Sequence, residues 1–333
     1  MNWKNLEKAT IAIAIVLLAG CAGARVSQVV EVPARQSGMA ESRKLAIFYF
    51  NGDIDGTITA QVESYLSNIN VRGIPYFEVL EREMLDKIIN EQRMVSSSGY
   101  FDENDAVRLG KLSGADTLIM GSASMPPTSS RYYRKAVDYC LDKKCTKKET
   151  RHKSCVDMST NVDLTLKAVS VQRGSIIFTQ TYSGKASDTD CGERHSKNDT
   201  DLRNEAMGQI LANLRKDVAP YQVKISIEFM DKDDSMNSAT KARLEEAMEY
   251  IRQERVDRAC EIFKDALAGD TNSPALYYNM GVCAEIEGDL DKAEDLYKLS
   301  ERKTAKPMRL ISGAINRVRT MKSNQNELSR QIH

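Results

Sequence analysis

The sequence has no excess charge of either sign, because 47 Lys and Arg residues balance 47 Asp and Glu residues over 333 positions. Without a positive net field there is no long-range attraction toward nucleic acid, and we expect no nucleic-acid partner. Long apolar runs are also scarce. The only run that approaches the length of a membrane span lies at the N-terminus, which argues against a multi-span helical membrane protein. The 41% hydrophobic content can fill the cores of about two domains.

Histidine and the common catalytic motifs are scarce as well. The sequence has only three histidines, His152, His195 and His333. It contains no phosphate-binding glycine loop, no HExxH zinc motif and no GxSxG nucleophile motif. The acidic cluster 231–234 (DKDD) lacks the Gly and Glu positions of a calcium loop and is interpreted as part of a linker. We therefore expect no enzymatic activity, no cofactor and no metal site.

The N-terminus has the three parts of a secretory signal. Lys4 and Lys8 precede the apolar run 9–18, and small residues follow that run. The ending LAGC resembles the lipobox of bacterial lipoproteins. This resemblance implies a signal peptide over 1–20 and makes Cys21 the first mature residue, with a diacylglycerol on its sulfur and a further acyl chain such as palmitate on its amino group. Two or more acyl chains make a stable membrane anchor.

The residues after Cys21 bear on sorting and reach. Ala22 and Gly23 follow, with no Asp directly after the cysteine, which resembles lipoproteins sorted to the outer membrane. The resemblance implies a lipid anchor on the periplasmic face of that membrane. Residues 21–42 show little periodicity and are predicted to be a tether.

Strand and helix patterns alternate along the middle of the chain. Apolar runs predict strands at 44–50, 76–80 and 115–121, and helical spacing predicts helices at 57–69, 81–93 and 102–112. The next patterns predict a hairpin of strands 162–171 and 176–182, a helix at 201–218 and a closing strand at 221–229. These elements predict an α/β (α+β) domain with a mixed sheet over residues 43–230.

Three segments of this domain resemble the CsgG-like outer-membrane lipoprotein family. They are FEVLEREMLDKIINEQRMV at 77–95, GADTLIMGS at 114–122 and VDLTLKAVSVQRGSIIFTQT at 162–181. Relatives with this fold include the curli secretion channel, the LpoB activator of a penicillin-binding protein, and periplasmic flagellar-ring lipoproteins. The resemblance implies a homo-oligomeric ring as one option, but a shared fold does not fix the function.

Two inserts, at 126–157 and 184–200, occupy the places where hairpins leave the curli channel subunit to build its transmembrane part. A strand in a membrane alternates apolar and polar residues over about 9 to 11 positions. The first insert contains DKKCTKKETRHK at 142–153, and the second has almost no apolar side chains. We therefore expect loops rather than membrane strands, which argues against a channel.

Most of the cysteines lie in these inserts. With Cys21 lipidated, six remain, and an even number in an oxidising compartment favours disulfides. The candidates are Cys140, Cys145, Cys155 and Cys191. Under the family resemblance both inserts leave the same end of the domain, so Cys191 could pair with one of the other three, and the remaining two would pair locally. The connectivity stays open among three possibilities.

Two other interpretations of cysteine remain. A zinc site is the alternative in the inserts, because His152 and His195 lie near the cysteines, although the spacing is not the usual paired CxxC pattern. Cys260 and Cys283 fall on predicted helices, where small core residues are the simpler interpretation.

The first insert is also basic. Lys143, Lys144, Lys147 and Lys148 are its candidate partner-binding residues. The alternatives are a solvated loop and a docking surface for an acidic partner or an anionic polymer.

The C-terminal third repeats with a period of 34 residues. The small and aromatic positions Ala247, Tyr250, Ala259, Phe263 and Ala266 recur as Gly281, Ala284, Ala293, Tyr297 and Ser300. This pattern resembles tetratricopeptide repeats and implies an all-α module of two repeats and a capping helix over 241–325, after a linker at 231–240. Tyr277 and Asn279 are its candidate partner contacts. The alternative is that the module only packs against the first domain.

Together these patterns predict a non-enzymatic scaffold or adaptor in envelope assembly, anchored to the outer membrane and facing the periplasm, with an envelope protein as partner. One alternative is a ring-forming secretion channel of the CsgG type. The other is an LpoB-like activator of a penicillin-binding protein.

Overall fold

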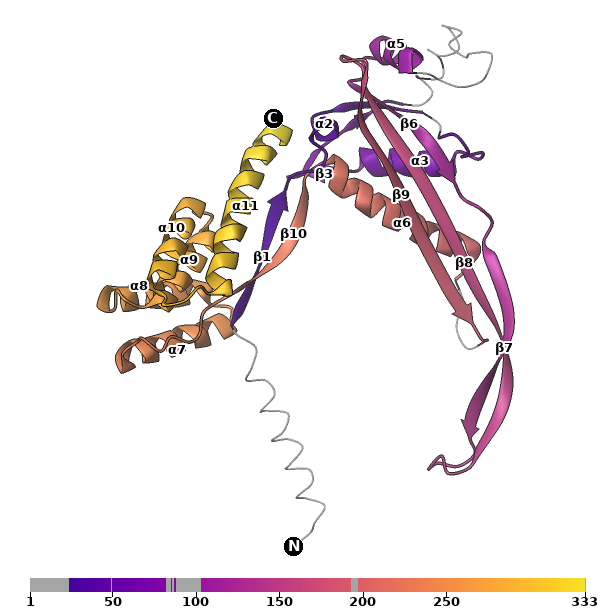
Figure 1. The fold of residues 1–333 in the computed structure, drawn as a ribbon. Helices are drawn as coiled ribbons and strands as arrows, with labels where there is room; N and C mark the ends of the chain where they lie inside the picture. Colours follow the sequence, from indigo (N-terminus) through magenta and orange to yellow (C-terminus); the bar gives the residue numbers. More distant parts are fainter. Residues whose placement is uncertain are drawn as a thin grey trace. The chain divides into compact units, whose positions relative to one another are not determined.

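The computed structural model describes residues 24–48, 50–81, 85, 87, 103–192 and 197–332. The chain divides into two units, whose elements are labelled in Figure 1. The sheet unit comprises Pro33–Tyr221 and Arg330–His333, and the helical unit comprises Met1–Val32 and Gln222–Ser329. Each unit has its own apolar core.

A six-stranded sheet forms the frame of the sheet unit. Its strands are β2 (Lys44–Ile47), β5 (Glu78–Val79), β6 (Thr117–Ser124), β7 (Ser129–Cys140), β8 (Lys148–Ser170) and β9 (Ser175–Asp190). β5 and β6 run parallel to β2 on either side of it, whereas β6, β7 and β9 all run antiparallel to β8. The sheet is therefore mixed, as the sequence predicts.

The long strand β8 organises this sheet. It pairs with β6 through 163–170, with β7 through 148–159 and with β9 through 156–170. Because a strand has two edges, β6 and β7 must follow one another along one edge of β8 while β9 occupies the other. Beyond Val156 only β7 accompanies β8, so the two strands continue past the sheet as a ribbon (Figure 1).

Two helices supply the main core of the sheet unit. α3 (Thr57–Ser67) and α6 (Asp199–Val218) bury side chains spaced four residues apart, which places them on one helix face. These side chains are Ile58, Val62 and Leu66 in α3 and Leu202, Ala206, Ile210 and Leu214 in α6. They pack against alternate residues of β8, from Val162 to Ala168. A Cβ at Gly184 would lie 1.9 Å from the Ala206 carbonyl oxygen, so only glycine lets α6 approach β9 this closely.

Short elements complete the sheet unit. They are α2 (Ser37–Ala40), β3 (Asn70–Val71), β4 (Ile74–Pro75) and α5 (Glu103–Ser113). The side chain of Asp53 caps α3, because its carboxylate accepts hydrogen bonds from the Ile58 and Thr59 backbone amides at 3.1 and 2.7 Å.

The helical unit contains α7 (Ser238–Arg252), α8 (Val256–Gly269), α9 (Pro274–Glu287), α10 (Leu290–Lys303) and most of α11 (Arg309–Ile332). Phe263, Tyr278 and Tyr297 are fully buried at its centre. The main chain of Gly281 lies against the Tyr297 ring, where a Cβ would come within 2.7 Å of two ring carbons. Among the described residues, no helix is both long enough and apolar enough to cross a membrane.

Two expectations, one about the tether and one about the last strand of the sheet, are wrong. The predicted tether contains a strand, β1 (Arg25–Val32), in which exposed and half-buried residues alternate over most of its length. Strand β10 (Tyr221–Glu228) forms as predicted, but it pairs with β1 and does not close the mixed sheet. The two form a separate two-stranded sheet, and the Phe229 amide donates to the Ala24 carbonyl at 2.9 Å. Strands that pair across nearly 200 residues leave no local signal of their partner.

The inserts are not loops. Residues 129–140 and 148–157 belong to β7 and β8, and residues 184–190 continue β9. Backbone pairing and disulfides hold these strands together. Their sequences lack apolar alternation, so a search for hydrophobic periodicity does not find them. The predicted strand at 76–80 shortens to β5, and the predicted helix at 81–93 lies outside the described residues except for 81, Leu85 and Lys87.

Candidate functional site

The ribbon formed by β7 and β8 is the most distinctive surface of the sheet unit. We call residues 129–157 the arm. Its register runs from the pair Ser129 and Ser159 to the pair Cys140 and Lys148 at the tip. Residues 129–157 hold nine Lys and Arg residues against four Asp and Glu residues, a net charge of +5 in a chain whose total is zero. The arm is therefore a local positive field, and the rest of the chain carries the balancing net charge of −5.

The tip of the arm is cross-linked and well bonded. Cys140 and Cys145 form a disulfide across the turn, with Cα atoms 4.7 Å apart. The Thr146 amide donates to the Asp142 carboxylate at 2.8 Å, and the Leu141 amide donates to the Lys147 carbonyl at 2.8 Å. Hydrogen bonds from Thr146 lower the pKa of Asp142 below its usual value. The turn is therefore held by a disulfide and by hydrogen bonds between its own residues.

The four predicted partner-binding lysines surround this turn. Lys143, Lys144, Lys147 and Lys148 are all exposed, and none of their ammonium groups forms an ion pair with another described residue. Leu141, in the same turn, is 59% exposed. Whether these lysines bind a partner stays a prediction.

Tyrosines and cations line the shaft of the arm. The Arg151 guanidinium carbon and the Lys153 ammonium nitrogen each lie 5.5 Å from the centre of the Tyr139 ring, within range of a cation–π contact. Tyr132 is 80% exposed. Exposed tyrosines among arginines are typical of residues that anchor protein interfaces.

A second disulfide fixes the base of the arm. Cys155 of β8 pairs with Cys191, which directly follows β9, and Cys155 is buried. The structure thus selects one of the three open connectivities, with Cys191 reaching the first insert and Cys140 pairing locally with Cys145. Nearby, Asn198 and Asp201 form a capping box that starts α6. The arm therefore leaves a rigid base.

The cysteines that a zinc site in the inserts would need as thiolates are bonded in disulfides. Cys145 and Cys155, which flank His152 in the sequence, belong to two different disulfides. Within the part of the chain that the structure describes, no three His, Cys, Asp or Glu side chains gather into a metal-binding group. Cys260 and Cys283 lie in the core of the helical unit, as expected, and they form a disulfide there. Cys21, His195 and His333 lie outside the described residues.

The two candidates in the helical unit occupy different environments. Tyr277 is half-buried, so part of its ring is accessible. Asn279 is fully buried, and its side chain holds the Met230 backbone: the amide oxygen accepts from the Met230 amide at 2.8 Å and the amide nitrogen donates to the Met230 carbonyl at 2.9 Å. Asn279 therefore has an internal structural role, which leaves Tyr277 as the accessible candidate.

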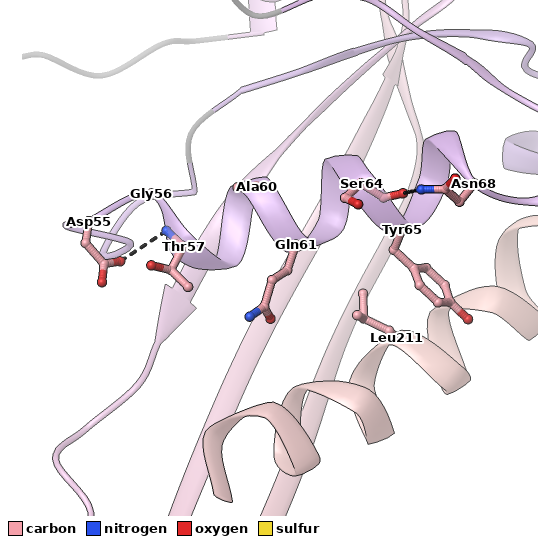
Figure 2. A pocket seen from close by; sticks show the side chains of 9 residues that line it. All are labelled: Asp55, Gly56, Thr57, Ala60, Gln61, Ser64, Tyr65, Asn68 and Leu211. Carbon is pink, nitrogen blue, oxygen red and sulfur yellow. Dashed lines mark hydrogen bonds between the residues drawn. The ribbon is translucent and has the colours of Figure 1, made fainter. Parts of the chain in front are cut away.

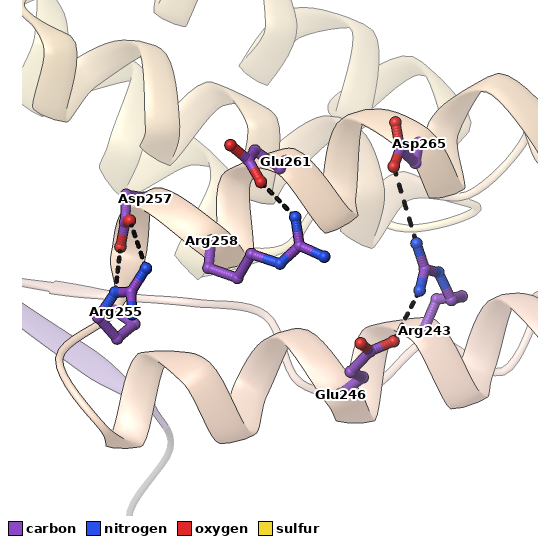
Figure 3. Close-up of polar contacts among 7 residues, drawn as sticks. All are labelled: Arg243, Glu246, Arg255, Asp257, Arg258, Glu261 and Asp265. Carbon is purple, nitrogen blue, oxygen red and sulfur yellow. Dashed lines mark hydrogen bonds and ion pairs between the residues drawn. The ribbon is translucent and has the colours of Figure 1, made fainter.

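The face of α7 and α8 in the helical unit is charged but internally neutralised (Figure 3). Arg255 forms two hydrogen bonds with Asp257, at 2.9 and 3.0 Å, and Arg258 pairs with Glu261. Arg243 lies 2.8 Å from Glu246 and 3.8 Å from Asp265. Because exposed ion pairs of this kind are worth little and cancel charge locally, this face lacks the unbalanced field of the arm.

An open groove of about 650 Å³ lies between α3 and α6 (Figure 2). Its wall includes Asp55, Gln61, Tyr65 and Leu211. The Asp55 carboxylate accepts from the Thr57 amide at 3.1 Å and so belongs to the start of α3. Burial raises the pKa of Tyr65 above its usual value. The groove brings together no nucleophile and base, and sequence patterns gave no sign of it.

Comparisons with known proteins address the sheet unit. Residues 73–197 match the family model described as the curli production assembly/transport component CsgG. The matched range contains β5 to β9 with the arm, so the chain carries a CsgG-like domain, as the sequence resemblance implies. No curated protein matches the chain.

Two solved structures are also similar. The lipoprotein GNA1162 from Neisseria meningitidis aligns with 11% identity and a TM-score of 0.25, over 46% of this chain and 88% of that one. The hypothetical protein CT253 from Chlamydia trachomatis aligns with 10% identity and a TM-score of 0.27, over 53% of this chain and 98% of that one.

Proposed function

We propose that this protein is a non-enzymatic scaffold or adaptor of the bacterial envelope, anchored to the outer membrane through lipid on Cys21 and facing the periplasm. In this proposal the CsgG-like sheet unit contacts one envelope partner and the helical unit holds a second. The observation that carries the proposal is that one chain contains two separately packed units, and one of them presents a disulfide-linked arm with unbalanced charge. An adaptor needs two separate binding units on one chain.

The disulfides support the location. All six cysteines from Cys140 onward are paired, in both units. Disulfides persist in oxidising compartments such as the periplasm and are rare in the cytosol. The lipobox at the N-terminus adds a membrane anchor, which raises the local concentration of the protein near other envelope components.

The packing of the helical unit supports an interpretation as tetratricopeptide repeats. Helices α7 with α8 and α9 with α10 form two successive pairs, which agrees with the 34-residue period. Gly281 occupies a small position of that pattern and contacts the aromatic position Tyr297 of the facing helix. Such repeats usually present a surface to peptides or partner domains.

The test is photo-crosslinking in cells, with the full-length protein carrying a photoreactive residue at Lys144 in the arm or at Tyr277 in the helical unit. The scaffold proposal predicts a crosslinked partner at each position and a weaker yield when Cys21→Ser removes the anchor. A photoreactive residue at exposed Glu301 is the control. The proposal is wrong if Lys144 and Tyr277 give only the crosslinks seen at Glu301.

One observation favours a second candidate, a CsgG-type secretion channel: the first insert is a β-hairpin rather than a loop. Its composition argues the other way, because Arg131 and Lys135 lie on one face of β7 and Arg134 lies on the other, so both faces carry charge that lipid does not tolerate. Negative-stain imaging of the lipidated protein and conductance across a planar bilayer separate the two. Closed rings that conduct ions would favour the channel, and isolated particles without conductance would favour the adaptor.

A further inference from the structure

The arm has open backbone edges. β7 is the last strand in the sheet order and pairs only with β8. On the opposite edge, residues 148–155 of β8 pair only with β7, because β9 begins to pair at Val156. No described strand covers either edge. Unpaired N–H and C=O groups along a strand can bind an extended segment as an additional strand.

The edge formed by β7 is strongly basic near its start. The run RYYRK at 131–135 contains three cations and two tyrosines and no acidic residue. Arg131, Arg134 and Lys135 are exposed, and none of them forms an ion pair with another described residue. Because side chains alternate along a strand, Arg131 and Lys135 share one face of the ribbon.

The register gives the two cations on this face of β7 different neighbours on β8. Arg131 lies opposite Asp157, whereas Lys135 lies opposite Lys153, whose ammonium nitrogen also lies 5.5 Å from the centre of the Tyr139 ring. Directly opposite residues on neighbouring antiparallel strands have Cβ atoms about 4.5 to 5.5 Å apart, where opposite charges attract and like charges repel. Lys135 therefore has no carboxylate opposite it on β8, and a carboxylate on a third strand beside β7 would supply one.

The charge also selects the occupant. The arm of a second copy would bring another net charge of +5 against the same edge, so pairing of two arms is opposed by repulsion. An acidic segment of a partner protein has the complementary charge, and acidic residues at alternate positions would fall beside Arg131 and Lys135. We propose that the outer edge of β7 binds an acidic, extended segment of a partner protein by strand addition. This inference names the class of partner for the proposed scaffold and rests on that function.

The first test measures binding of a short fluorescent peptide, in which Glu alternates with Thr and Val, to the oxidised full-length protein by fluorescence anisotropy. The double variant Arg131→Glu, Lys135→Glu should weaken binding by at least about tenfold. The matched control Lys241→Glu, Lys264→Glu makes the same charge change at exposed positions of the helical unit and should change the affinity by less than about threefold. Equal loss in the two variants would mean that the net charge of the protein, and not the β7 edge, attracts the peptide.

The second test separates strand addition from simple charge attraction. The same peptide with every backbone nitrogen methylated keeps all its carboxylates but has no N–H donors, and it should no longer bind. Undiminished binding would overturn the proposal. Binding to vesicles that contain phosphatidylglycerol is the third measurement. If the protein binds these vesicles but not the peptide, the arm binds membranes and the proposal is wrong.

These outcomes are distinct from failure of the scaffold proposal. The peptide measurement uses purified protein in solution and does not depend on lipidation or on cells. If Lys144 crosslinks an envelope partner in cells but the peptide does not bind, the scaffold role stands and the strand-addition mode is wrong. If the peptide binds but no partner is crosslinked in cells, the edge has the proposed chemistry and the scaffold role lacks support.

Discussion

Gln331 and Ala34 lie 297 positions apart in the sequence and are joined by two hydrogen bonds inside the sheet unit. The Ala34 amide donates to the Gln331 side-chain oxygen at 2.7 Å, and the Gln331 side-chain nitrogen donates to the Ala34 carbonyl at 3.1 Å. Both residues are buried. The Gln331 carbonyl also accepts from the Tyr76 hydroxyl at 3.0 Å. The end of the chain is therefore built into the sheet unit.

The variant Gln331→Ala leaves the buried N–H and C=O of Ala34 without partners. Each such group costs about 1 to 3 kcal/mol, so we expect the sheet unit to lose about 2 to 6 kcal/mol of stability. Urea unfolding combined with hydrogen exchange at β2 measures this loss. Gln325→Ala, at an exposed position of the same helix, is the control and should change stability by less than about 0.5 kcal/mol. A similar loss in both variants would assign the effect to the helix rather than to the Ala34 contact.

Glu294 predicts a pH-dependent stability of the helical unit. Lys298, Arg319 and Lys322 lie 2.9, 2.9 and 3.1 Å from its carboxylate. Hydrogen bonds from these cations lower the pKa of Glu294 from 4.5 to about 2. A carboxyl group whose pKa is lower in the folded state stabilises the fold above its unfolded pKa, and this contribution is lost as the pH falls from 4.5 toward 2.

The measurement compares urea midpoints of the wild type and Glu294→Gln across this pH range. We expect the difference between them to be largest above pH 4.5 and to shrink steadily as the pH approaches 2. Glu301→Gln, at an exposed position of the same helix, controls for the loss of one negative charge. A difference between wild type and Glu294→Gln that does not change with pH would contradict the prediction.

Substitution by alanine should lower the stability of the protein at Gly281 and raise it at Gly313. Gly281→Ala places a Cβ 2.7 Å from the Tyr297 ring, and this ring cannot move easily because its hydroxyl donates to the buried Glu285 at 2.6 Å. We expect a loss of about 1 to 3 kcal/mol from overpacking. Gly313→Ala, inside α11, meets no atom within 4 Å and should stabilise the helix by about 0.5 to 1 kcal/mol. Thermal unfolding of the two variants provides the comparison. If both variants gain stability, the contact between residue 281 and the Tyr297 ring does not restrict the size of the side chain at 281.

The two arm disulfides should differ in their contribution to stability. Cys155 and Cys191 are separated by 36 positions, and Cys140 and Cys145 by 5. Removing the longer link with Cys155→Ser, Cys191→Ser should cost about 2 to 4 kcal/mol, and removing the shorter one should cost about 1 to 2 kcal/mol less, because closing a longer loop restricts the unfolded chain more. Unfolding midpoints and hydrogen exchange at the end of β9 test this order. The idea fails if the tip disulfide proves the more important of the two.

The sequence predicted what local patterns encode. Alternating Val162, Leu164 and Leu166 identified a strand of the core, and helical spacing identified α3, α6 and the helices of the C-terminal third. The arm lysines were recognised by composition. Other features depend on long-range pairing and have no local pattern. β7 is polar on both faces, the groove between α3 and α6 is created by packing, and Asn279 was assigned to a surface because its bonding to Met230 spans 49 positions.

The order in which the cysteines pair has a consequence for biogenesis. From Cys140 onward, the six cysteines form three pairs of sequence neighbours: 140 with 145, 155 with 191, and 260 with 283. If the thiols were oxidised in the order of synthesis, every second cysteine of this series would join the free thiol before it. Oxidation in that order would produce the observed set without the rearrangement of wrong pairs.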